Sequence, residues 1–206
     1  AGQKRRMRMR LTIDRMAVVS CDISGSKDNV AYVGAERLAL LGNKLRDARE
    51  SHVLRVWQAF MGVISDNEVS GSSLGNSEGR HALKLHGPGF SSFQSVNEYG
   101  TPSPDTGLLG KRTEYVVVSG NVFGSSGPWP VTIGPQDALT DSLLSNIVFE
   151  RNRIASEFGS QGPRKVDVAL CVWASDTVIR NNVMDGSGSG NDYTGILVDR
   201  RGAEPA

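Results

Sequence analysis

Ser119-Gly120-Asn121-Val122-Phe123 is one copy of a short pattern that recurs along the chain and decides its fold. In each copy an apolar strand runs into a small or polar pair, then Asn, then any one residue, then an apolar residue. The first copy has Asp in place of Asn. The recurring positions are Asp22, Asn43, Asn67, Asn121, Asn152 and Asn182. Their spacings are 21, 24, 54, 31 and 30 residues, so four of the five fit one repeat with a variable loop.

A second short apolar strand precedes each of these segments. These strands lie at 9–11, 30–33, 52–57, 81–86, 130–133 and 168–172, and a last one at 195–198 has no Asn segment after it. Asn at a repeated corner tolerates left-handed backbone angles, and its amide can bond the Asn of the next repeat. Repeats of this kind, stacked in register, predict a parallel β-solenoid with an Asn ladder inside one turn.

The repeated strand-Xaa-Asn-Xaa-apolar turn resembles the right-handed parallel β-helix superfamily, which includes pectate lyases, alginate and chondroitin lyases, polygalacturonases, epimerases and phage tailspikes. The resemblance covers roughly residues 7 to 200. It implies an all-β fold, a single parallel β-helix domain over 1–206 with about six to seven coils and one long loop at 87–114. The alternative is a β-sandwich with chance Asn spacing, in which hairpin signals would replace the repeated corner.

Composition removes several classes of protein. No apolar run approaches the ~20 residues that span a bilayer, so we expect no membrane partner. The formal charge is only +1, and the one basic cluster, Lys4 to Arg10, has no interleaved aromatics, so we expect no nucleic-acid partner. Two cysteines make neither a disulfide framework nor a zinc site. We expect a secreted or periplasmic protein whose signal peptide is not in this chain.

The sequence predicts no amphipathic capping helix at either end of the expected solenoid. The chain starts directly in the alternating segment Met7 to Asp14 and ends in a short charged stretch that contains Pro205. An open end exposes unpaired backbone groups. A fragment of a larger protein, or a homo-oligomer that covers the ends, would each account for this.

One outward column of the predicted solenoid is basic and aromatic. The segments His52 to Trp57 and His81 to His86 match residue by residue, so Arg55 should stack beside Lys84, and Trp57 beside His86. Extending this register gives the full column: Arg10, Tyr32, Arg55, Lys84 and Thr132. Stacked like charges repel unless an anion lies over them, which indicates an acidic partner.

A uronic-acid polysaccharide fits this column, because its carboxylates would pair with Arg55 and Lys84 while its sugar faces stack on Trp57 or Tyr32. Arg10 would extend the same binding surface, and Trp129 and Trp173 are further candidate sugar platforms or parts of loop packing. The alternative to a binding surface is a solvent-exposed face whose basic residues form ion pairs with acidic loop residues.

Elimination chemistry would need a base, a cation for the carboxylate and an acid for the leaving oxygen. Lys84, Arg55, His86 and Tyr99 could fill those roles, and Tyr99 lies in the long loop that follows His86. The two other histidines, His52 and His81, begin equivalent strands and are expected to be structural.

The signatures of the known catalytic branches are missing from the sequence. It has no Asp-Pro-His-Glu string, no polygalacturonase-type Asn-Thr-Asp and no calcium-binding Asp cluster. We therefore expect no cofactor and no metal, calcium having no motif to support it. The leading hypothesis is a carbohydrate-active β-helix that binds or eliminates an acidic polysaccharide. The alternative is a non-catalytic solenoid such as an adhesin or tailspike segment.

Overall fold

The computed structural model describes residues 13–72, 80–87, 112–124, 129–134, 144–155, 168–186 and 193–198. These residues form β-strands, turns and bends, and none of them is helical. Within these ranges there is accordingly no helix long and apolar enough to cross a membrane. The all-β class expected from the sequence is confirmed.

The strands group into three sets, which we call the first, second and third faces. The first face contains the N-terminal parts of β3 (Ala31–Leu41) and β5 (Leu54–Ser65), with β7 (Leu83–Leu85), β10 (Val131–Ile133), β13 (Val168–Val172) and β16 (Thr194–Val198). The second face contains β1 (Ile13–Val19), the C-terminal parts of β3 and β5, β8 (Thr113–Ser119), β11 (Leu144–Glu150) and β14 (Ser175–Arg180). The third face is a separate sheet of β2 (Asp22–Ser24), β4 (Lys44–Arg46), β6 (Glu68–Ser70), β9 (Val122–Gly124), β12 (Arg153–Ala155) and β15 (Val183–Asp185).

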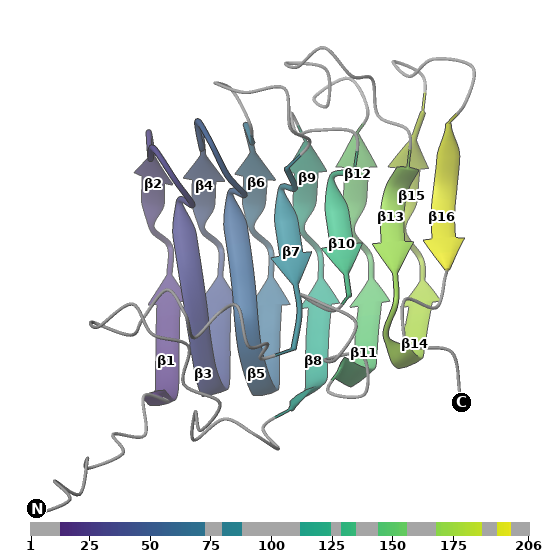
Figure 1. Ribbon diagram of the computed structural model, residues 1–206, viewed down its shortest axis with the longest axis horizontal. Coiled ribbons are helices and arrows are strands. Elements are labelled where there is room, and N and C mark those ends of the chain that lie inside the picture. The colour runs from purple at the N-terminus through teal and green to yellow at the C-terminus, as the bar shows by residue number, and fades with distance from the viewer. Residues whose placement is uncertain are drawn as a thin grey trace, which may run out of the picture.

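All of the strand pairings between these elements are parallel, and each joins a strand to its equivalent one repeat away. Figure 1 shows the consequence: the colours advance from purple to yellow along the long axis while the chain passes repeatedly between curled sheets. Parallel neighbours need such a returning path, since a hairpin can only make antiparallel pairs. The arrangement is consistent with the expected β-solenoid type of fold.

The corner between the second and third faces depends on a left-handed residue. Ser20, Gly42, Asp66, Gly120, Arg151 and Asn181 all have φ between 52° and 69°. Each stands directly before a residue of the ladder corner. A left-handed angle at this single residue turns the chain sharply, and the next short strand then starts in register.

The Asn ladder runs through five consecutive repeats. The side-chain Nδ2 of Asn43 donates to Oδ1 of Asn67 at 2.9 Å, and Asn67 donates in the same way to Asn121 at 2.8 Å. The ladder continues from Asn121 to Asn152 at 2.9 Å and from Asn152 to Asn182 at 3.1 Å. The Oδ1 of each of the last four Asn residues also accepts a hydrogen bond from the backbone N–H of the preceding Asn, so these buried polar groups have hydrogen-bond partners.

Asp22 does not belong to this ladder, contrary to the expectation from sequence. Cys21 occupies the corner of the first repeat, because its backbone N–H donates to Oδ1 of Asn43 at 3.0 Å. Asp22 is the next residue, pairs in register with Lys44, and binds Arg46 on the exposed side of the third face. The spacing to the following apolar residue, Ile23, is the signal that identifies Cys21 as the corner.

The core lies between the faces and is built from rows of apolar residues one repeat apart. One row on the third face is Ile23, Leu45, Val69, Phe123, Ile154 and Met184. Phe123 stacks on Phe149 of the second face with ring centroids 6.1 Å apart, which joins two faces across the interior. Each fully buried side chain of this size contributes about 1.5 to 3 kcal/mol, so the rows supply the main stabilisation of the repeat.

Candidate functional site

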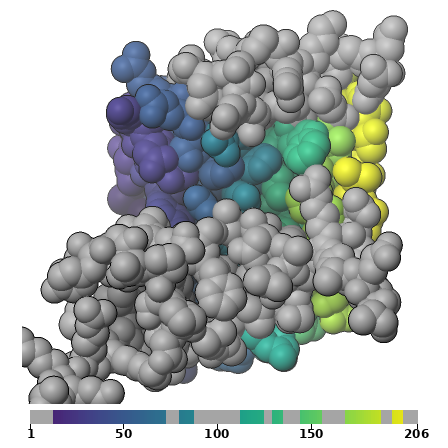
Figure 2. All heavy atoms as spheres, viewed as in Figure 1, coloured from purple at the N-terminus to yellow at the C-terminus, as the bar shows by residue number. Residues whose placement is uncertain are grey.

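The outward column expected on the first face is present in the strand register. Tyr32 pairs with Arg55, Arg55 with Lys84, and Lys84 with Thr132. The register then continues through Cys171 to Leu197. The inward rows on either side of the column are apolar, so alternation places these residues on the outer side of the sheet. In Figure 2 the described atoms of the molecule form a band of surface that runs from the N-terminal to the C-terminal strands.

Exposure changes along this column. Tyr32 is exposed, and Arg55 and Lys84 are half-buried, whereas Thr132 and Cys171 are buried. An anionic ligand could therefore reach the column at Tyr32, Arg55 and Lys84, but not at Thr132 or Cys171. We call Tyr32, Arg55 and Lys84, with the neighbouring Trp57, the basic-aromatic patch.

The Arg55 guanidinium is held by two neighbours. Its Cζ lies 4.9 Å from the centroid of the Tyr32 ring, and its Nε donates a hydrogen bond to Nε2 of His86 at 3.0 Å. A cation over an aromatic face gains roughly 0.5 to 2 kcal/mol, depending on its exposure. These contacts hold the Arg55 side chain in one orientation. Less rotamer freedom is therefore lost when Arg55 binds a ligand.

His86 is a positioning residue and not an exposed base, contrary to the expectation from sequence. It lies on the outer side of the sheet but is 0% exposed, and its Nδ1 donates to the carbonyl of Gly87 at 2.7 Å. Since Arg55 can only donate, Nε2 must be the unprotonated nitrogen. Burial, followed by the Arg55 and Lys84 charges, lowers the pKa of His86 to about 3. The imidazole is therefore neutral, with both nitrogens engaged.

The other two histidines form a buried stack beside the patch. The His52 and His81 rings are stacked and nearly parallel, with centroids 4.8 Å apart, and the backbone N–H of His81 donates to Nδ1 of His52 at 3.0 Å. His81 Nδ1 lies 2.6 Å from the carbonyl of Trp129 and donates to it. Both contacts serve the backbone of the corner, which agrees with the structural role expected for these residues.

Cations lie near both of these histidines. Burial lowers the pKa of His52, and it lowers the pKa of His81 to about 3. Among the described residues, the charged groups that reinforce both effects are cations: Lys84, Arg55 and Arg80. The charges of these three cations disfavour protonation of the two histidines and would stabilise an anion bound nearby.

Trp57 owes its position to a bulge in β5 and to a glycine in β3. The pairing of β3 with β5 skips one residue between Val33 and Gly34, and the skipped position in β5 is Trp57. Its indole lies over Gly34, where an added Cβ would come within 2.3 Å of Cε2. The ring meets Tyr32 edge-on at 6.5 Å. The bulge thus turns Trp57 toward Tyr32 and extends the aromatic part of the patch.

Trp173, further along the first face, also packs over a glycine. Its indole lies over Gly134, where an added Cβ would approach Cε3 within 2.3 Å. Trp173 is buried in a small cluster with Cys171 and Val168, and its ring lies 6.1 Å from that of the half-buried Trp129. Of the two roles considered from sequence, the structure favours packing over a sugar platform for Trp173.

Two predicted site residues, Arg10 and Tyr99, lie outside the described residues. The described ranges contain no group of three or more His, Cys, Asp or Glu side chains that could hold a metal ion. Neither protein-family models, nor curated proteins, nor solved structures give a match to this chain.

Proposed function

We propose that the chain is a right-handed parallel β-helix whose first face binds an acidic polysaccharide rich in uronic acid. The observation that carries the proposal is the register of Tyr32, Arg55 and Lys84 on three neighbouring parallel strands. Parallel strands are about 4.8 Å apart, so the two cations sit at a spacing close to that of one sugar unit. A carboxylate per sugar could then meet Arg55 and Lys84 in succession.

The aromatic members of the patch suit a sugar polymer better than a small inorganic anion. Tyr32 and Trp57 offer ring surfaces beside the cations, and sugar rings pack their C–H faces on such surfaces. Arg55, oriented by His86, would bind a carboxylate through its planar guanidinium. Lys84 would supply a point charge to the next carboxylate along the chain.

Binding is better supported than catalysis. His86 cannot act as a free acid or base near neutral pH, because its pKa is about 3 and both ring nitrogens are hydrogen-bonded. If the face does turn over its ligand, the favoured reaction is β-elimination. Arg55 would neutralise the carboxylate, and Lys84, as the neutral amine, would take the proton from the carbon next to it. The bond from the following carbon to the glycosidic oxygen would then break, and the departing oxygen would take up the proton from Lys84. A binding or adhesin-like module needs neither step.

A panel of polymers tests this proposal. Polygalacturonate, alginate and chondroitin would be titrated into the protein by calorimetry, with neutral dextran as the control. We expect binding to at least one polyuronate, weakening as salt is raised because the ion pairs are partly exposed, and no binding to dextran. Absorbance of the unsaturated product in the far ultraviolet separates elimination from binding alone. Equal affinity for dextran, or no affinity for any polyuronate, would reject the proposal.

A further inference from the structure

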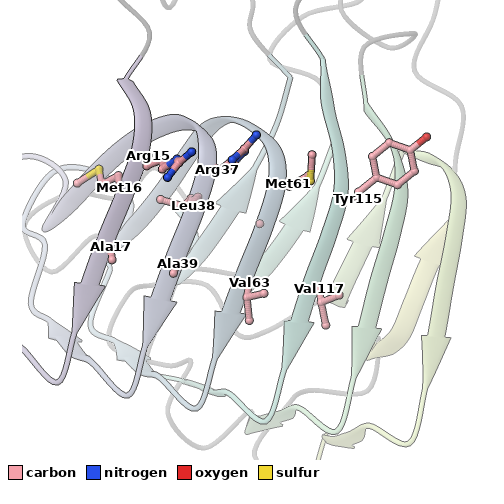
Figure 3. A pocket seen from close by; sticks show the side chains of 11 residues that line it. Arg15, Met16, Ala17, Arg37, Leu38, Ala39, Met61, Val63, Tyr115 and Val117 are labelled. Carbon is pink, nitrogen blue, oxygen red and sulfur yellow. The ribbon is translucent and has the colours of Figure 1, made fainter.

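The second face carries an exposed apolar surface on its outer side, away from the basic-aromatic patch. Ala17, Ala39, Val63, Val117, Val148 and Val178 lie in one register row across six neighbouring parallel strands. Val63 and Val178 are 42% and 48% exposed. Figure 3 shows Ala17, Ala39, Val63 and Val117 projecting from neighbouring strands into a shallow groove. The row is therefore an exposed apolar surface on the outer side of a parallel sheet.

A second row, closer to the start of these strands, is graded in charge. Arg15, Arg37 and Met61 are paired in register, and Tyr115, Asn146 and Asp176 follow at the equivalent positions of the next three strands. The row therefore begins with two cations, passes two large apolar side chains and ends with an acid. Met61 and Tyr115 are 46% and 56% exposed and line the groove.

We propose that this face docks against the same face of a second copy of the chain, about a two-fold axis that runs parallel to the strands between β5 and β8. Such an axis reverses the order of the strands and keeps each row opposite itself. Arg15 then faces Asp176 of the second copy, Arg37 faces Asn146, and Met61 faces Tyr115. In the apolar row, Val63 faces Val117.

This two-fold arrangement is the one that the charge gradient favours. A two-fold axis along this row, across the strands, would keep the strands in the same order and set Arg15 against Arg15 and Asp176 against Asp176, which is repulsive at both ends. The small side chains of the apolar row permit close approach of two sheets, and Met61 and Tyr115 fill the centre. Arg37 has no ion-pair partner within the described part of its own chain, so a polar contact across the interface costs no existing bond.

The size of the face sets the expected strength. Six strands about 4.8 Å apart, each with about 20 Å of length, offer roughly 600 Å² per copy, or roughly 1,200 Å² in the pair. That value is at the lower end for specific protein interfaces. A dimer that dissociates on dilution through the micromolar range is therefore expected.

Sedimentation velocity over a concentration series tests the proposal with residues 1–206. The wild type should shift from monomer to dimer as concentration rises, and Val63→Glu should raise the dissociation constant at least tenfold. Val183→Glu is the control, since Val183 is an exposed valine (58%) on the third face, and it should leave association unchanged. Circular dichroism and thermal melting would show that both variants remain folded.

A charge exchange tests the two-fold axis itself. Arg15→Asp should weaken association by like-charge contact with Asp176, and the further change Asp176→Arg should restore it. Asp176 has a left-handed φ of 49°, and Arg151, with a φ of 52°, shows that the chain accommodates arginine at such a position. A wild type that stays monomeric at all concentrations, or a dimer that is indifferent to Val63→Glu, would overturn the proposal. A double variant no stronger than Arg15→Asp alone would overturn the two-fold arrangement.

Discussion

The Nε–H of Arg55 donates to a neutral imidazole, that of His86, at a distance of 3.0 Å. A neutral acceptor orients a cation without taking charge from it. This contact orients Arg55 and does not itself neutralise it, because burial and the adjacent cations keep His86 unprotonated. The first face can therefore present a directed positive charge to a ligand.

The neutral state of His86 makes folding depend on pH. Its pKa is about 3 in the folded chain against 6.5 for the free side chain, so the unfolded chain takes up a proton that the folded chain does not. This contribution to stability is complete above pH 6.5 and is lost progressively as pH falls toward 3. His86→Gln should remove this contribution. Between about pH 6 and 4, the free energy of unfolding of the variant should therefore fall less steeply with decreasing pH than that of wild type, by about 1.4 kcal/mol per pH unit. Urea unfolding at several pH values measures this slope. Because His52 and His81 are present in both proteins, their effects cancel, and parallel curves would contradict the assignment.

Gly34 is expected to control the position of Trp57. Gly34→Ala places a methyl group within 2.3 Å of the indole, so Trp57 must rotate away from β3. We expect a destabilisation of about 1 to 3 kcal/mol, stronger quenching of tryptophan fluorescence by acrylamide and weaker polyuronate binding. Gly195→Ala is the matched control, since its added Cβ would find only Met184 Sδ at 4.0 Å. Identical quenching in Gly34→Ala and wild type would show that Trp57 does not depend on this contact.

The centre of the Asn ladder should matter more than its end. Asn121 donates to Asn152 and to the carbonyl of Ile64, and its Oδ1 accepts two bonds from Asn67. Asn121→Leu leaves several buried groups unsatisfied and should cost about 3 kcal/mol or more in the free energy of unfolding. Asn182→Leu should cost clearly less, because Asn182 is half-buried and water can replace its bonds. Chemical denaturation compares the two, and equal losses would argue against a cooperative ladder.

The sequence was sufficient to predict the repeat, the ladder from Asn43 onward and the outward column of Tyr32, Arg55, Lys84 and Thr132. These features follow from alternation along a strand and from equal offsets in adjacent repeats, which are properties of the local chain. The error at Asp22 arose from matching residue type rather than spacing, since Cys21 stands two residues before its apolar partner Ile23, as every ladder Asn does.

The burial of His86 and Trp173 could not be predicted in this way. Alternation indicates the side of the sheet on which a residue lies, but it does not indicate what covers that side. The placement of Trp57 over Gly34, and of Trp173 over Gly134, depends on contacts between residues 23 and 39 positions apart in the chain. The stacking of His52 on His81 likewise requires the three-dimensional register of two repeats.

The most direct test of the binding face removes one charge from it and one from elsewhere. Lys84→Ala takes a cation from the basic-aromatic patch, whereas Lys44→Ala takes one from the exposed side of the third face, where its Nζ lies 4.0 Å from Glu68. Calorimetric titration with a polyuronate that the wild type binds should show Lys84→Ala weakened by about tenfold or more, equivalent to at least about 1.4 kcal/mol. Lys44→Ala should bind within about twofold of wild type, and neither variant should change Tm appreciably. Equal affinities for all three proteins, or a large loss of Tm in Lys84→Ala with unchanged binding, would contradict the account.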